Sequence, residues 1–172
     1  MTCKVKVLSL FGVEYRCRQF SAIEGMSIFD VENLHPSVLL SKTEVQTKKG
    51  KWKPLSDGAA INRHVVDKLG VFTPLQVLNM LMELVRKENF GFLSSWKGVR
   101  VPSRFLSDSK QVQSEYTTPM LAALINENKA SLKELEEYYS LEDSFRMFDM
   151  LSMKNVNEAL SNEAAQSRAR TR

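Results

Sequence analysis

The side chains best suited to catalysis or metal binding are few and scattered along the chain. The histidines are His35 and His64, and the cysteines are Cys3 and Cys17. No CxxC pair occurs, and no spacing matches a zinc or iron site, whose ligands come in close clusters. His64 precedes Asp67 by one helical turn, a spacing more typical of a structural pair on a helix surface than of a catalytic one. We therefore expect neither a metal site nor a cofactor.

Loops that hold phosphates or activate a nucleophile are also missing from the sequence. The stretch KKGKWK at residues 48–53 lacks the GKS/T arrangement of a phosphate-binding loop. No G-x-S-x-G nucleophile motif occurs. The acidic residues near the C-terminus lie where helix starts favour acids: Glu134, Glu136, Glu137, Glu142 and Asp143. The pattern indicates a protein that is not an enzyme.

Composition and charge are those of an ordinary globular protein. The chain has 172 residues, of which 43% are hydrophobic and 26% charged, and its net charge is +4. This length can bury a core without a metal or a disulfide. The N-terminal MTCKVKVLSL predicts a strand and not a signal peptide, and no apolar run is long enough to predict a membrane span. We expect a cytosolic protein with free thiols.

Alternating side chains at residues 3–20 predict two half-buried strands that form a hairpin. All the charged residues of this stretch have even numbers, and most of its apolar residues have odd numbers: Cys3, Val5, Val7, Phe11, Val13, Tyr15 and Cys17. A turn centred on Gly12 would place Val7 opposite Cys17, and it would leave Cys3 too far from Cys17 for a disulfide. The even-numbered face would then be basic, either solvated or in contact with an anion.

Three further elements are predicted in the N-terminal part. A short helix within residues 21–35 would end before Pro36, because the residue before a proline disfavours helical backbone. Residues 43–58, TEVQTKKGKWKPLSDG, predict either another strand or a hairpin with KKG at its turn. Residues 59–70 predict a helix that Gly70 would stop.

The clearest helix is predicted at residues 74–88. Thr73 is a suitable N-cap, Pro74 suits the first helical position, and Gly91 follows the last turn. The next segment, residues 90–119, is irregular and predicts a connector with one short strand at KGVRVP.

From residue 116 onward the pattern predicts short helices. Thr118-Pro119 is a cap-then-proline start, and the serine and glutamate at positions 131 and 134 form a capping box. Ser140 with Asp143 repeats a serine-led start, and a last helix is expected at residues 155–165. Helices this short depend on packing against one another for stability.

Together these elements predict an α+β fold. An N-terminal antiparallel hairpin or small sheet packs with helices, and a C-terminal bundle of short helices follows. We place the boundary at about residue 115, so that residues 1–115 form the body and residues 116–172 form a helical module with a frayed basic tail.

Methionine and tyrosine side chains mark a candidate partner-binding surface in the C-terminal module. Met147, Met150 and Met153 are spaced by three residues, and methionine is common on adaptable surfaces that grip apolar helices. Tyr138 and Tyr139 complete the set. The alternative for each of these residues is burial in a core.

A second segment, FGFLSSWKGVRVPSRF at residues 90–105, mixes aromatic rings with cations. Trp96, Lys97, Arg100 and Arg104 have the composition used to bind single-stranded nucleic acid. The alternative is that the rings fill the core beneath the connector while the cations face solvent, and the irregular spacing of the rings favours it.

The C-terminal stretch TTPMLAALINENKASLKELEEYYSLEDSFRMFDMLSMKNVNEAL resembles the tail assembly chaperones of long-tailed bacteriophages. The resemblance rests on Tyr139 to Asp143, Met150-Leu151 and Asn155 to Glu158, in a pattern like YSLED…ML…N. The opening GVEYRCRQFSAIEGM is similar to the strand-then-helix start of some of these chaperones. The two stretches cover about half of the chain, and residues 40–115 contribute little.

The resemblance implies a function without catalytic residues. Such a chaperone binds the long, helical, aggregation-prone tape measure protein and keeps it soluble while tail tube subunits polymerise around it. It acts in the cytoplasm of the bacterial host and is absent from the mature virion. The tail tube protein and further copies of the chain remain open as partners, and no membrane is implied. Many members also have a longer form made by ribosomal frameshifting, which a protein sequence does not reveal.

Two alternatives remain open at this stage. A nucleic-acid-binding regulator is suggested by the sequence pI near 9.1, the lysines at residues 42–53 and the Trp96 segment; its affinity would fall steeply with salt. Nucleic acid is the less expected partner. A structural tail or baseplate component of the virion is the other alternative.

Overall fold

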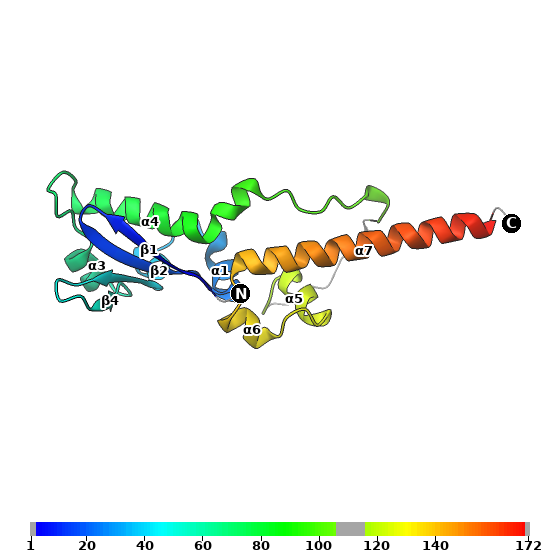
Figure 1. Ribbon diagram of the computed structural model, residues 1–172, viewed down its shortest axis with the longest axis horizontal. Coiled ribbons are helices and arrows are strands. Elements are labelled where there is room, and N and C mark those ends of the chain that lie inside the picture. The colour runs from blue at the N-terminus through cyan, green and yellow to red at the C-terminus, as the bar shows by residue number, and fades with distance from the viewer. Residues whose placement is uncertain (1–2, 106–115, 171–172) are drawn as a thin grey trace.

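The fold begins with a four-stranded antiparallel sheet whose neighbouring strands follow chain order (Figure 1). The computed structural model describes residues 3–105 and 116–170. Its strands are β1 Val5–Leu10, β2 Val13–Arg18, β3 Thr43–Gln46 and β4 Trp52–Pro54. With the helices that follow, the sheet confirms the predicted α+β fold. The predicted N-terminal hairpin is present, and of the two alternatives for residues 43–58 the hairpin is the one that forms.

The β1–β2 turn differs from the predicted one. Phe11 and Gly12 both adopt left-handed backbone, with φ of 46° and 75°, which makes the two-residue turn of a tight hairpin. Val7 pairs with Arg16, so the prediction that it lies opposite Cys17 was wrong. A shift of one residue in register moves every side chain of a strand to the other face.

The two faces of the sheet therefore differ from the predicted alternation. The core face carries the odd-numbered residues of β2, Val13, Tyr15 and Cys17, which are all buried. The odd-numbered residues of β1 lie on the opposite face, where Val5 and Val7 are 57% and 58% exposed. The predicted basic face is correct for β2, but in β1 the exposed valines take the place of the lysines.

Helices cover the core face of the sheet. They are α1 Ala22–Phe29, α2 Pro36–Leu39, α3 Gly58–His64 and α4 Pro74–Phe90. The predicted long helix is α4, with Thr73 as its capping residue and proline at its first position. Val77, Leu81 and Val85 of α4 are fully buried in the core that includes the sheet. Burial of this apolar stripe fixes α4 on the sheet.

Two segments of the body differ from their predictions. Helix α3 ends at His64 and does not reach Gly70, because the Asp67 carboxylate accepts three backbone N–H groups from residues 69–72 and forms a turn. The strand predicted at residues 97–102 is not formed. The connector instead contains two short 3-10 helices, η1 Gly91–Ser95 and η2 Ser103–Phe105.

The C-terminal helices start at their predicted positions, although the Thr118 side chain makes no capping hydrogen bond at the start of the first of them. They are α5 Pro119–Asn126, α6 Leu132–Glu137 and α7 Leu141–Arg170. Ser131 and Glu134 form the reciprocal capping box of α6. At the start of α7, the Ser140 hydroxyl accepts the Asp143 N–H, and the Asp143 carboxylate accepts the Ser140 N–H, both at 3.2 Å. Each cap reverses the chain and allows the helices to fold back on one another.

The prediction of a separate last helix at residues 155–165 was wrong. Helix α7 is one continuous helix of 30 residues, about 45 Å long at 1.5 Å per residue. Residues 152–155, SMKN, contain no glycine or proline that would stop it. The expected frayed tail is helical to Arg170, and α7 projects away from the sheet toward the C-terminus (Figure 1).

Helix α1 joins the body to the C-terminal helices. Its Ala22 is fully buried in a second core with residues of α5, α6 and α7. The Ala22 N–H donates to the Tyr139 carbonyl at 2.8 Å, and Ser21 forms an isolated β-bridge with Ser140. The predicted boundary at residue 115 lies outside the described residues. These contacts show that the N-terminal part packs directly on the C-terminal helices.

Candidate partner-binding surface

The five residues predicted to bind a partner fall into two groups. Met147 and Tyr139 are partly buried and pack against the second core. Tyr138, Met150 and Met153 are 41%, 59% and 52% exposed. An α-helix has 3.6 residues per turn, so side chains spaced by three residues point in successively different directions. The first methionine of the series therefore lies toward the core, and the next two lie toward solvent. The exposed group, Tyr138, Met150 and Met153, is called the partner surface below.

Two exposed leucines extend the apolar surface beyond the predicted residues. Leu132 of α6 is 51% exposed, and Leu160 of α7 is 38% exposed. Leu160 follows Met153 by seven residues, so both lie on the same side of one helix. The seven-residue spacing is visible in the sequence, but the prediction of a separate helix at residues 155–165 assigned Met153 and Leu160 to different helices.

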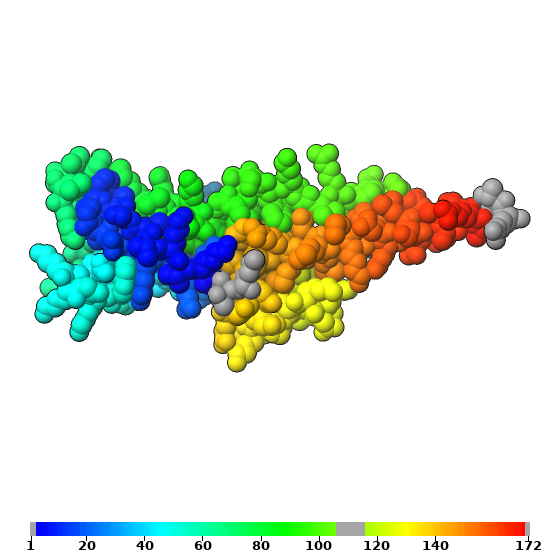
Figure 2. Space-filling view, in the orientation of Figure 1, coloured from blue at the N-terminus to red at the C-terminus, as the bar shows by residue number. Residues whose placement is uncertain are grey.

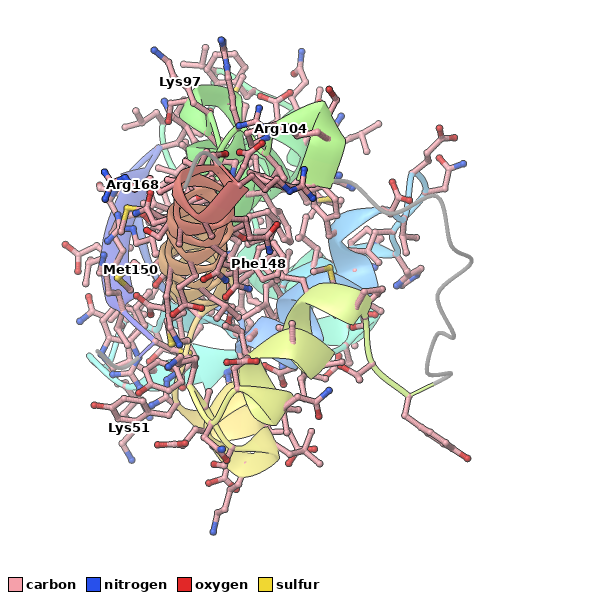
Figure 3. All side chains as sticks on the ribbon, turned by 90° about the vertical axis from the view of Figure 1, so that its right-hand side faces the viewer. Lys51, Lys97, Arg104, Phe148, Met150 and Arg168 are labelled. Carbon is pink, nitrogen blue, oxygen red and sulfur yellow. The ribbon has the colours of Figure 1, made fainter. Side chains whose placement is uncertain are left out.

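The partner surface adjoins the sheet. The Cys3 N–H donates to the Tyr138 carbonyl at 3.1 Å, which places the start of β1 against the end of α6. Figure 2 shows β1 and α7 adjoining on one face of the molecule. Viewed along α7, Met150 lies on the side of β1, whereas Phe148 lies on the side of α5 (Figure 3). Met150 is thus directed away from the second core.

The aromatic rings of the connector pack against one another. Trp96 lies edge-on to Phe92 and Phe145, with ring centroids 6.3 and 5.6 Å apart, and Phe92 lies 5.4 Å from Phe145. Phe145 belongs to α7, so this cluster fixes the connector to that helix. Trp96 is half-buried, and the rings do not form an open row on which bases would stack.

The cations of the same segment have different surroundings. Arg104 forms a bidentate ion pair with Glu163 of α7, and its guanidinium lies 4.7 Å from the Phe105 ring centroid. Of the residues predicted for nucleic acid, Trp96 and Arg104 therefore contact other parts of the protein, although the Arg104 side chain is 53% exposed. Lys97 and Arg100 are exposed and have no ion pair within the described residues. Figure 3 shows where Lys97 and Arg104 lie relative to α7.

The basic face of the sheet is partly neutralised. Arg16 forms an ion pair with Glu44 and stacks over the Trp52 ring at 4.8 Å. Lys42 pairs with Glu24 at 2.7 Å. A shallow hollow of about 490 Å³ lies here, lined by Val5, Arg16, Arg18, Ser41, Lys42, Glu44 and Pro54. Arg16 and Lys42 are paired with acids, but Arg18 also lines the hollow and forms no ion pair within the described residues, so the hollow keeps some excess positive charge.

The two cysteines and His64 have pKa values that are shifted by their surroundings. Burial raises the pKa of the Cys3 and Cys17 thiols, which disfavours the reactive thiolate. Burial, followed by the charges of Lys53 and Arg63, lowers the pKa of His64. Within residues 3–105 and 116–170, no three His, Cys, Asp or Glu side chains are grouped to hold a metal ion.

No protein-family model, curated protein or solved structure matches this chain. In the described part of the chain, none of the helices has the length and apolar character needed to cross a membrane. The structure defines an α+β protein with a projecting C-terminal helix, and its most distinctive surface is the exposed apolar row on that helix.

Proposed function

We propose that this chain is a non-enzymatic binding protein, namely a tail assembly chaperone of a long-tailed bacteriophage that binds the tape measure protein. The observation that carries the proposal is the partner surface, where Met150 and Met153 are more than half exposed. Single exposed apolar residues are ordinary, but a group on one module favours an interaction site. The sequence resemblance at residues 139–158 supplies the identity of the client.

The geometry suits a client that is itself helical. Methionine side chains are flexible and polarisable, so they adapt to different apolar ridges on a partner helix. The exposed residues Met150, Met153 and Leu160 span about 15 Å along α7, and a client helix can lay its apolar stripe along this surface. Covering that stripe would keep the tape measure protein soluble in the bacterial cytoplasm until tail tube subunits replace the chaperone.

Co-expression with the tape measure protein of the same phage tests the proposal. We expect the chain to raise the soluble fraction of that protein and to co-purify with it. The double variant Met150→Glu, Met153→Glu should abolish both effects, because binding would bury two carboxylates against the apolar surface of the client. Asn155→Glu with Asn162→Glu is the matched control, since it adds the same charge at exposed positions of α7.

Three outcomes would contradict the proposal. The first is a tape measure protein that stays insoluble and does not co-purify. The second is the presence of the chain in purified mature particles, detected by mass spectrometry, which would indicate a structural tail or baseplate component. The third is salt-sensitive binding of nucleic acid that Lys97→Glu and Arg100→Glu remove, which would indicate the regulator.

A further inference from the structure

Strand β1 forms one edge of the sheet, and its outward backbone groups are unpaired. The two-residue turn makes the even-numbered residues of β1 exchange hydrogen bonds with β2. Just before the strand, the Gln19 N–H continues this pattern by donating to the Lys4 carbonyl at 2.9 Å. The odd-numbered residues therefore direct their backbone N–H and C=O groups away from β2, where no hydrogen-bond partner is found among the described residues. These edge residues are Val5, Val7 and Ser9.

The opposite edge of the sheet is protected, whereas β1 is open. Strand β4 has three residues and ends at Pro54, and short strands with proline are a common protection against added strands. Strand β1 has six residues and no proline. Its Val5 and Val7 are 57% and 58% exposed, and Figure 2 shows the strand on the molecular surface. The one charged residue of β1, Lys6, is paired with Glu88 of α4, so little on this edge repels a further strand.

The sheet face beside this edge is basic. On the face opposite the core, Arg18 lies across from Val5, and Arg16 lies across from Val7. Val5 and both arginines also line the hollow of about 490 Å³. Arg16 is paired with Glu44, but Arg18 has no ion pair in the described part of the chain. Neighbouring strands lie about 4.8 Å apart, so a long acidic side chain on a strand next to β1 can reach across Val5 to the Arg18 guanidinium.

We propose that the edge of β1 binds an extended acidic segment of a partner protein, which joins the sheet as a fifth strand. Its main chain exchanges hydrogen bonds with Val5, Val7 and Ser9, and its carboxylates pair with Arg18. Glu14 lies opposite Ser9, so the acidic residues of the segment belong at the Val5 end. This site is separate from the partner surface and does not depend on the proposed chaperone function.

The composition of this face favours a polypeptide over nucleic acid. Proteins that bind single strands on a sheet stack bases on open aromatic rings. Here the Trp52 ring is covered by the Arg16 guanidinium, which lies 4.8 Å from the ring centroid, and valines occupy the strand at the edge. Unpaired main-chain groups beside exposed valines fit another β-strand instead.

Binding of a synthetic peptide to the full-length chain is the first test. The probe is an eight-residue peptide of alternating valine and glutamate with blocked ends, and the control peptide has lysine in place of glutamate. The probe should bind and should slow amide hydrogen exchange at Val5, Val7 and Ser9, because their free N–H groups become hydrogen-bonded. The control peptide should not bind. Absence of binding by the probe, or protection confined to other elements, would overturn the inference.

Variants of the full-length chain test the two parts of the site. Val7→Pro removes one outward N–H without removing a hydrogen bond to β2, so it should abolish binding of the probe, whereas Val7→Thr should bind normally. Arg18→Glu should weaken binding severalfold, and Lys129→Glu, with the same charge change at an exposed position away from the sheet, should not. Circular dichroism of each variant shows that the fold is kept.

Two results with these variants would overturn the proposed mode of binding. One is equal affinity of Val7→Pro and the unsubstituted chain for the probe. The other is binding of oligothymidine that Arg18→Glu removes and Val7→Pro leaves unchanged, which would make this face a nucleic-acid site. All of these assays omit the tape measure protein, so their failure is distinguishable from failure of the chaperone proposal.

Discussion

Asn89 is a buried polar residue that ties α4 to the end of the β1–β2 hairpin. It is 5% exposed, its side-chain oxygen accepts the Phe20 N–H at 2.8 Å, and its side-chain nitrogen donates to the Val85 carbonyl at 2.8 Å. Phe20 directly precedes Ser21, which caps α1. Asn89 therefore fixes the point where the chain leaves the sheet and enters the helix that joins the two cores.

We predict that Asn89→Leu lowers the free energy of unfolding by about 1–3 kcal/mol, because the buried Phe20 N–H loses its acceptor. Urea unfolding followed by circular dichroism measures the change. Asn79→Leu, at an exposed position of the same helix, should change the stability by less than about 0.5 kcal/mol. Equal midpoints for Asn89→Leu and the unsubstituted chain would contradict this role.

Some residue-level features follow from local chemistry and others do not. The caps at Thr73, Ser131 and Ser140 could be predicted, because a hydroxyl that accepts a nearby N–H needs only its own neighbours. The register of the β1–β2 hairpin could not be predicted, since it depends on a left-handed backbone at Phe11, which bulky residues rarely adopt. Met147 was assigned to the surface because its spacing from Met150 did not reveal where the second core begins.

At the scale of elements, α1 and α7 approach each other at a glycine. A Cβ atom added to Gly25 would lie 3.1 Å from the Leu141 Cβ, which is closer than ordinary packing allows. A short helix within residues 21–35 was predicted from its own sequence, but the contact of α1 with the start of α7 was not. The spacing of apolar residues in a helix predicts which of its faces is buried. It does not predict which element, far along the chain, packs against that face.

Gly25→Val should lower the free energy of unfolding by about 1–3 kcal/mol, because the added methyl groups overfill the contact with Leu141. Ser27→Val, at an exposed position of the same helix, should cost much less. Leu141→Ala makes room for the valine. The double variant Gly25→Val, Leu141→Ala should therefore lose less free energy of unfolding than the sum of the losses in the two single variants. Urea unfolding of the four chains in this cycle gives the coupling. Strictly additive losses would show that the two residues do not meet.

At the scale of the whole molecule, the two cores lie near one end of a long helix. Residues 161–170 of α7 are all exposed. Arg104 of the connector forms an ion pair with Glu163 in this segment, and the two side chains are 53% and 47% exposed; such pairs contribute about 0–1 kcal/mol. A short helical segment with little packing is marginal in water. The distal half of α7 therefore depends on continuity with residues 141–151.

Amide hydrogen exchange along α7 should reveal this division, because local opening follows the amount of packing. At low protein concentration we predict slow exchange at residues 141–151 and fast exchange at residues 161–170. Uniformly slow exchange along α7 would contradict this prediction, because it would mean that the distal half is as well packed as residues 141–151.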